Sequence, residues 1–516
     1  MTAATDAPVR PRPPRTAGAV PLTAARLLRL ELRRNAMPWI LPLIAALFWF
    51  DSYRPSTGMP PIWILRTFWN MGQGHTIIDF GPFVAGVAAW MGSRDGRRGT
   101  ADLVTATARP RWAMQLATWA ATVSWAVGAY LVFVGVMFGV YAHQGLQGTP
   151  PWWWVAVGAA GVAAFSTAGF AVGAYFPSRF AAPLAAFGGF LALVTSSQTG
   201  FSHTSGWALI LPTNSNGNYG ADSGIFYPYL PDLPIARVMF LGGIAVAAAG
   251  LLGLPARAGG PRLRWTAAVV TLAGVAAAGT AVGLADTARP GPHGMVIPAL
   301  HDAASDRPIP YTPACGHAAG VPVCLNPAYG RYLPDVTAAL RPVLDEAAGL
   351  PGTPVRAVQV AATYAADQDV HLSPTAVIPA ETIGGSPPVL RLPLGHLNLP
   401  GAFGSDQPEF VNQLRLQFVH AFVNAGPGAG TAAQQSVQAA LLQGAGVPFA
   451  AQPKVLAIDG LPPSGPPAPD GPGPASGPVY AAARRLAALP AAARHAWLAA
   501  HLAALRSGQL TLGQLP

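Results

Sequence analysis

The sequence has little charge for its length. Only 10% of its 516 residues are charged, whereas a typical soluble domain has about 25%. Hydrophobic residues make up 51%, and long apolar runs fill the first half, which excludes a single soluble domain. Intrinsic disorder of that half is also excluded, because disorder requires low hydrophobicity and high charge. The composition therefore predicts a polytopic membrane protein, and one that carries a water-exposed module at its end fits best.

Lysine is almost absent, since Lys454 is the single lysine among 31 basic residues. The net charge is nevertheless +10, and it is uneven: residues 1–285 carry +11, whereas residues 286–516 carry −1. The arginines stand at the ends of apolar runs and do not form one patch. This distribution argues against a nucleic-acid partner.

Motifs for hydrolytic chemistry are missing. The sequence contains no GxxxxGK[ST] phosphate loop, so any ATP hydrolysis belongs to another chain. It contains no GxSxG elbow and no HExxH motif, and no two histidines of the second half stand four residues apart. We therefore expect no catalytic residue, no metal ligand and no cofactor of its own.

Seven apolar segments approach the ~20 residues that a bilayer crossing needs. They cover residues 36–52, 75–93, 113–141, 152–176, 181–198, 236–254 and 265–285, and the first and fifth are short. A basic helix is predicted before them over residues 22–34, with Arg26, Arg29 and Arg33 on one face and leucines roughly opposite. It would lie in the membrane interface or extend the first span.

Arginines segregate to alternate sides of these segments. Sixteen lie in the N-terminal region and in the loops 94–111, 177–180 and 255–264, whereas the opposite loops hold three, one of them at a span boundary. The positive-inside rule then predicts a cytoplasmic N-terminus in the cell membrane. Seven crossings place residues 286–516 outside.

The second half has globular patterning. Helical periodicity is found at 336–350, 409–423 and 431–443, and strand-like alternation at 354–360 and 387–394. We predict an all-α polytopic membrane domain followed by a smaller mixed α/β extracytoplasmic domain. The expected divisions are a cytoplasmic tail and interfacial helix (1–35), a transmembrane domain (36–285), a Gly/Pro tether (286–297), a globular domain (298–460), a Pro/Gly-rich linker (461–478) and a helical segment (479–516).

The chain has two cysteines, Cys315 and Cys324, both in the second half. Outside the cytoplasmic membrane, their spacing favours a disulfide that closes a small loop. A metal site with His317 and two free thiols are the alternatives.

Asp79 is a candidate polar residue within the second apolar segment. Ionisable residues in spans are costly and are functional candidates by default. Asp79 is also close to His75 and the predicted outer boundary, so a carboxylate that reaches headgroups or water is the alternative.

The loop between the second and third predicted spans reads GSRDGRRGTADLVTATARPRW (92–112). An acidic residue and a basic pair precede Gly-Thr, and a leucine and a Pro-Arg pair follow. The matching residues are Asp95, Arg97, Arg98, Gly99, Thr100, Leu103, Pro110 and Arg111. In this order the loop resembles the cytoplasmic loop of permease subunits of type-2 ABC exporters.

The resemblance covers roughly residues 22–254 and implies that this loop docks on a separate ATP-binding subunit. It also implies an amphipathic helix before the first span and a homodimer or paired permease among membrane lipids. Members of the family commonly end after six spans, so the seventh span and the tail depart from the pattern. The expected function is export of an unidentified substrate across the cell membrane. The alternatives are a membrane-anchored extracytoplasmic binding or sensory protein and, more weakly, a membrane-anchored degenerate peptidase.

Overall fold

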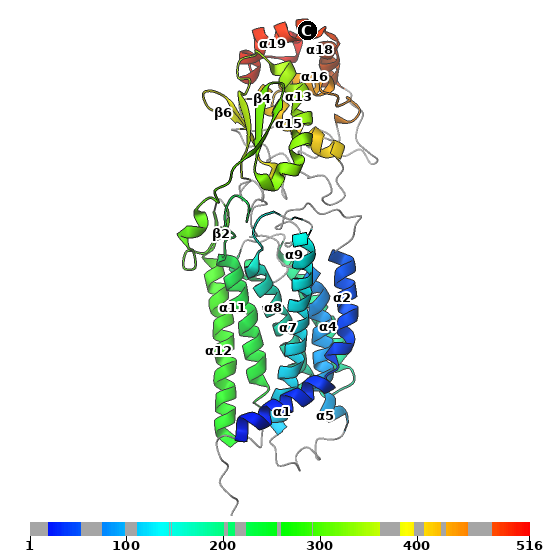
Figure 1. The fold of residues 1–516 in the computed structure, drawn as a ribbon, viewed down its shortest axis with the longest axis vertical. Coiled ribbons are helices and arrows are strands. Elements are labelled where there is room, and N and C mark those ends of the chain that lie inside the picture. The colour runs from blue at the N-terminus through cyan, green and yellow to red at the C-terminus, as the bar shows by residue number, and fades with distance from the viewer. Residues whose placement is uncertain are drawn as a thin grey trace, which may run out of the picture.

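The computed structural model places a bundle of long helices at one end of the molecule and a mixed α/β domain at the other (Figure 1). It describes residues 19–52, 75–98, 111–143, 145, 147–200, 205–211, 223–254, 260–291, 293–361, 382–396, 407–424, 430–452 and 477–516.

All seven apolar segments form helices, and the predicted basic helix precedes them. The helices of this part are α1 (Ala19–Arg34), α2 (Met37–Ser52), α4 (His75–Gly92), α5 (Arg94–Arg97), α7 (Arg111–His143), α8 (Trp152–Tyr175), α9 (Ala181–Gly200), α10 (Gly206–Ile210), α11 (Asp232–Leu251) and α12 (Gly260–Asp286).

Four of these helices are long and apolar enough to cross a membrane, which indicates a membrane protein. They contribute the spans Trp112–Val140, Trp152–Tyr175, Asp232–Leu251 and Pro261–Asp286. The apolar parts of α2, α4 and α9 are shorter than a crossing needs: Met37–Leu47, Phe80–Gly92 and Ala181–Ser196. Seven crossings therefore stay a prediction.

Small residues bring the helices of the bundle close together. A Cβ atom added to Gly169 or Gly173 of α8 would collide with the carbonyl oxygens of Ala85 and Ala89 on α4. Small residues at such positions let helix backbones approach in a membrane, where packing replaces the hydrophobic effect as the force between helices. The contact between α4 and α8 consequently requires glycine.

The stretch 286–297, expected as a tether, contains a folded hairpin. Strands β1 (Arg289–Gly291) and β2 (Gly294–Val296) pair antiparallel directly after α12. Met295 and Ile297 are buried in a core cluster that continues from α8 and α11 into the α/β domain. The burial of these apolar side chains explains why a Gly/Pro-rich segment is ordered here.

The α/β domain contains a five-stranded sheet in the order β3-β4-β5-β7-β6. The pairs β4–β5 and β5–β7 are parallel and the two edge pairs are antiparallel. Its strands and helices are β3 (Ala314–Ala318), β4 (Val321–Leu325), α13 (Leu333–Ala347), β5 (Arg356–Gln359), β6 (Ile383–Gly384), β7 (Val389–Leu392), α15 (Gln407–Val423), α16 (Ala432–Gly444), α18 (Pro478–Ala488) and α19 (Ala491–Arg506). Helix α13 packs on β3 and β4, and α15 packs on α13 and α16.

The C-terminal helices belong to the same core as this domain. Helix α18 packs on α16, and α19 contacts α15 and α16. Leu486, Leu498 and Leu502 are buried in this core. Residues 479–516 thus complete the globular domain, although they were expected to form a separate segment. The predicted linker 461–478 lies almost wholly outside the described residues.

Cys315 and Cys324 form a disulfide across the β3–β4 hairpin. They face each other in the strand register, and their Cα atoms are 4.1 Å apart. The hairpin turn uses Ala319 and Gly320, which both have positive φ, as a two-residue type I′ turn requires. Because both sulfurs are bonded, the free-thiol reading and the metal site with His317 are wrong.

We expect this disulfide to be oxidised in the native protein. Since the chain has only these two cysteines, any thiol signal reports this pair alone. Labelling of intact cells with a maleimide should modify the chain only after reduction, and reduction should destabilise the domain by about 2–3 kcal/mol. Equal labelling with and without reductant would contradict the prediction.

Candidate functional site

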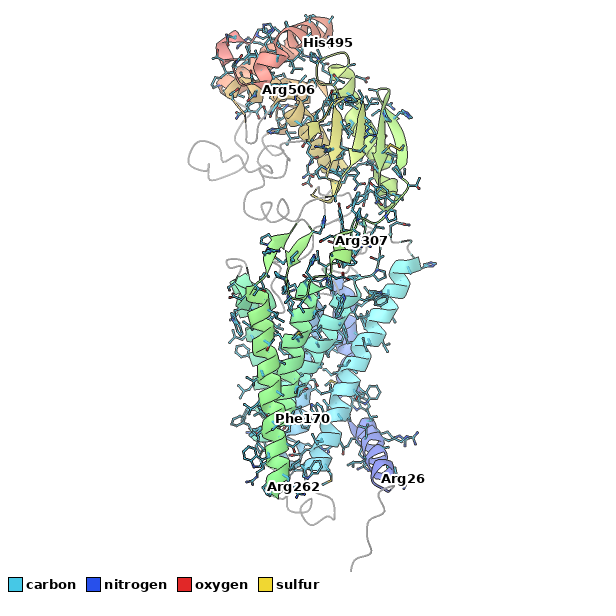
Figure 2. The ribbon with its side chains drawn as sticks, turned by 90° about the vertical axis from the view of Figure 1, so that its left-hand side faces the viewer. Arg26, Phe170, Arg262, Arg307, His495 and Arg506 are labelled. Atoms are coloured by element: carbon cyan, nitrogen blue, oxygen red, sulfur yellow. A yellow bond between two sulfur atoms is a disulfide. The ribbon has the colours of Figure 1, made fainter. Side chains whose placement is uncertain are left out.

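The arginine-rich segments gather at one end of the bundle. Arg26 and Arg262 lie at that end, whereas Arg307 and Arg506 lie beyond the opposite end (Figure 2). The turn after α8 lies there too, because Pro177 is in contact range of Gly96 in α5. All four segments that the arginine pattern assigned to one side of a membrane thus share one end of the molecule.

Helix α1 is attached to α7 at this end by polar contacts. The Trp125 indole Nε1 donates to the Leu32 carbonyl at 2.9 Å, and the Asn35 amide donates to the Thr122 hydroxyl at 2.8 Å. The Asn35 side-chain oxygen also accepts from the Met37 backbone N–H at 2.9 Å, which satisfies a free donor at the start of α2. Asn35 therefore fixes the corner between α1 and α2.

An ion pair connects α1 to the turn after α4. The Arg94 guanidinium donates to both carboxylate oxygens of Glu31, at 3.1 and 3.2 Å. The side chains are only 21% and 10% exposed. Burial opposes the charge of Arg94, but the hydrogen bonds and charge of Glu31 raise the pKa of Arg94 overall. Such bidentate pairs are strong and directional.

Sequence reasoning missed Glu31. The signal was available, because Glu31 is the single acidic residue of α1. It also lies away from the face that carries the arginines, and it is buried.

The residues of the predicted docking loop are described only in part. Asp95, Arg97 and Arg98 are described, whereas Gly99, Thr100, Leu103 and Pro110 lie outside the described residues. Arg111 begins α7.

The described loop residues differ in how accessible their charges are. Asp95 lies 3.6 Å from the Nε of Arg94. The Arg97 guanidinium lies 3.4 Å from the ring centroid of Trp90 and donates to the Trp90 carbonyl at 2.9 Å. Arg98 is exposed. The Arg97 side chain is thus bound to the last turn of α4. Arg98 is therefore the more accessible positive charge.

The second candidate, Asp79, lies in the second turn of α4, between the buried residues Ile77 and Phe80. The position of its side chain is outside what the structure describes, so both readings of Asp79 stay predictions.

A carboxylate that the sequence did not single out lies at the opposite end of the bundle. Helix α11 begins at Asp232, four residues earlier than predicted, after Pro231. Asp232 is completely buried, and it accepts from the Ile297 backbone N–H at 2.9 Å and contacts His301 Nδ1 at 3.2 Å. His301 Nε2 contacts Asp306 at 3.0 Å. This triad (Asp232, His301, Asp306) joins the first turn of α11 to the segment that leads into the α/β domain.

Because α11 begins at Asp232, Arg237 lies inside the helix. The sequence pattern had placed it at a span boundary. Arg237 is 0% exposed, and its Nε donates to the Leu209 carbonyl of α10 at 2.9 Å. Its guanidinium also lies 5.3 Å from the ring centroid of Trp154. Buried arginines in apolar helices are functional candidates, and here the contacts attach α10 to α8 and α11.

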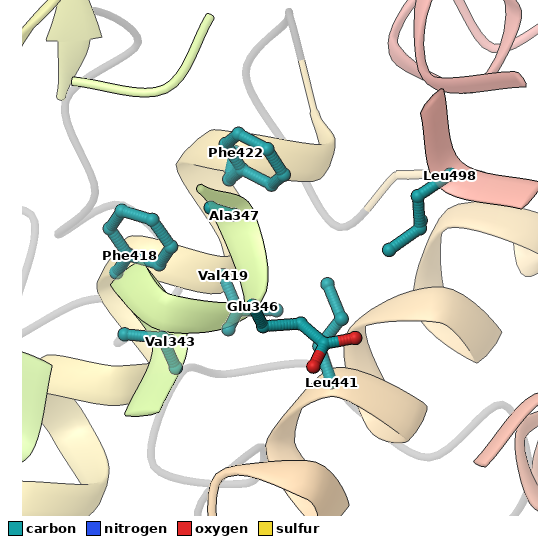
Figure 3. A pocket seen from close by; sticks show the side chains of 8 residues that line it. All are labelled: Val343, Glu346, Ala347, Phe418, Val419, Phe422, Leu441 and Leu498. Atoms are coloured by element: carbon teal, nitrogen blue, oxygen red, sulfur yellow. The ribbon is translucent and has the colours of Figure 1, made fainter. Parts of the chain in front are cut away.

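A small cavity lies between α13, α15, α16 and α19 of the α/β domain. It is lined by Val343, Glu346, Ala347, Phe418, Val419, Phe422, Leu441 and Leu498 (Figure 3). Arg494 pairs with Glu346 at 2.6 Å at its margin. A volume of about 10 Å³ has room for one water, so this cavity is not a substrate pocket.

The peptidase alternative requires a zinc site with two histidines one helical turn apart and a glutamate beside them. Among the described residues, no group of three or more His, Cys, Asp or Glu side chains is placed to hold a metal.

We predict that the Glu31–Arg94 pair stabilises the bundle. Arg94→Gln should lower the free energy of unfolding by about 2 kcal/mol, because it leaves a mostly buried carboxylate unpaired. Glu31→Gln should have a similar effect, and the double variant should lose less than the sum. Thermal unfolding in detergent measures this, with the exposed Arg262→Gln as the control. A loss for Arg94→Gln no larger than for Arg262→Gln would contradict the role of the pair.

We also predict that the triad holds more tightly in acid. The hydrogen bond to Asp306, only partly offset by burial, and the charge of Asp232 together raise the pKa of His301. Because the pKa of His301 is higher in the folded chain than in the unfolded chain, protonation of His301 stabilises the fold. This stabilisation is complete below the unfolded pKa of about 6.5, and it is lost as the pH rises through the folded pKa. Exchange of the Ile297 amide, corrected for its intrinsic rate, should therefore be slower at pH 5.5 than at pH 8. Asp306→Asn should reduce this pH dependence, and an unchanged dependence in that variant would refute the assignment.

Comparisons with known proteins identify no relative of this chain. No family model matches the chain, and neither a curated protein nor a solved structure matches it.

Proposed function

We propose that the chain is the permease subunit of an ATP-binding-cassette exporter, and that a separate ATP-binding subunit docks at the arginine-rich end of the bundle. In this proposal all seven apolar helices cross the cell membrane. The N-terminus is cytoplasmic, and the α/β domain is extracytoplasmic. The substrate class stays open, because apolar helix faces do not distinguish lipids, peptides and small drugs.

The observation that carries the proposal is the connection from the loop 94–111 into the bundle. This loop begins at α5, whose first residue, Arg94, pairs with Glu31 of α1. Helix α1 is in turn bonded to α7, the helix that follows the loop. A force applied to the loop therefore reaches α4, α7 and α1 together, as coupling of ATP hydrolysis to alternating access requires.

The positions of the charges support the proposed orientation. The end with Arg26 and Arg262 is opposite the α/β domain, and the positive-inside rule assigns such an end to the cytoplasm. Because an impermeant reagent reaches only the outer surface, labelling of Cys315 and Cys324 on intact cells after reduction also tests this orientation. Labelling that requires permeabilised cells would contradict it.

A second function is favoured by the way the α/β domain is attached. Asp232, Met295 and Ile297 join this domain to the outer end of α11 through buried contacts. Such a junction also suits an extracytoplasmic binding or sensory protein that signals through its helices. The proposed ATP-binding-cassette exporter requires an ATP-binding subunit as its partner, whereas a sensor does not.

We predict that Leu103→Asp abolishes copurification of the proposed ATP-binding subunit. Leu103 would be the apolar anchor of the docking loop, and truncation of a buried anchor costs about 2 kcal/mol or more. Arg98→Ala should weaken copurification only mildly, because an exposed charge contributes about 0–1 kcal/mol. The measurement is a pull-down from membranes, with membrane insertion of each variant monitored in parallel.

The reverse ranking would contradict docking. If the arginines only set the orientation of the chain, Arg98→Ala would disturb insertion, and Leu103→Asp would have no effect on the pull-down. That result would remove the main support for a transporter.

A further inference from the structure

Helix α1 presents an arginine surface that no acidic residue in the described part of the chain balances by an ion pair. Arg26, Arg29 and Arg33 are exposed, and their spacing puts them on one stripe of the helix. Among the described residues, no carboxylate forms an ion pair with any of the three. The single acid of α1, Glu31, is buried in its pair with Arg94. The outward face of α1 therefore carries positive charge only.

The orientation of this stripe is fixed by the opposite side of the helix. The Leu32 carbonyl accepts from Trp125 of α7, and Glu31 is held by Arg94. Since these contacts hold α1 from the bundle side, the arginines cannot turn inward. The stripe points away from the bundle at the end that Figure 2 marks with Arg26.

Exposed apolar side chains lie beside the stripe and continue along α2. Leu30 is 42% exposed, Trp39 is 87% exposed and Leu43 is 51% exposed. Tryptophan at the end of an apolar helix is typical of the headgroup level of a membrane. A basic face next to such residues is the pattern of a helix that lies in the interface.

We propose that the stripe Arg26–Arg29–Arg33 binds the phosphate groups of anionic phospholipids, and that this binding holds α1 against the bundle. The occupant is a lipid headgroup and not a protein, because the neighbouring exposed groups, Leu30 and Trp39, suit the acyl–headgroup boundary. Each arginine near an anionic membrane surface adds an attraction that falls off within a Debye length. The proposal requires only that α1 lies at the membrane surface, so it does not depend on the exporter function.

Amide exchange of the full-length chain in nanodiscs tests this proposal without any ATP-binding subunit. We compare discs of phosphatidylcholine alone with discs that contain about one-third phosphatidylglycerol. Exchange of the amides of residues 24–34 should slow by about tenfold in the anionic discs, because a ligand that binds only the docked helix suppresses its opening. At about 0.5 M salt the difference should shrink strongly.

Three variants separate charge from folding. The triple variant Arg26→Gln, Arg29→Gln, Arg33→Gln should lose the slowing, and the corresponding Arg→Lys triple should keep it. The matched control neutralises three exposed arginines of the α/β domain, Arg331, Arg341 and Arg356, and should behave as the native chain. Exchange of α11 amides verifies that each variant is folded.

Several outcomes would overturn the proposal. Equal α1 exchange of the native chain in the two kinds of disc would exclude a role of anionic lipid. Slowing that persists in the Gln triple would place the lipid site elsewhere. Slowing by inorganic phosphate in neutral discs would show a phosphate site that needs no lipid.

Discussion

The ion pair between Glu31 and Arg94 joins two segments that are separated by 63 residues in sequence. Because both groups are mostly removed from water, neither charge is tolerated there without the other. The pair thereby holds α1 against α5, with the arginine face of α1 exposed. The corner at Asn35 is held separately, by the hydrogen bonds of Asn35 to Thr122 and Met37.

The end of the bundle next to the α/β domain is organised around a second buried charge. The Asp232 carboxylate begins α11, where a negative charge is favoured by the helix dipole. It also accepts from the Ile297 backbone and contacts His301. The segment between the last apolar helix and the α/β domain is thus bonded to the bundle over several residues.

These two charged centres lie at opposite ends of the bundle. At one end, Arg94 couples the loop 94–111 to three helices. At the other end, Asp232 couples α11 to the domain that carries the disulfide. Helices α4 and α8 pack between the two ends at distances that only glycine permits.

The sequence by itself determined the features that depend on neighbouring residues. Apolar runs predicted the membrane helices, and helical periodicity over 431–443 predicted α16, which Thr431 caps. The cysteine spacing predicted the disulfide. These features are local, because capping, periodicity and short-loop closure act within a few residues along the chain.

Only the tertiary structure decided the pairing of Glu31 with Arg94, the contact of Asp232 with His301 and the order of the strands. It also brought α18 and α19 into the core of the α/β domain and ordered the predicted tether. Each of these depends on which surfaces meet after folding, and the charge and polarity of the residues alone do not specify their partners. The physical reason is that a buried charge is stable with any suitable partner, and only packing selects which partner is within reach.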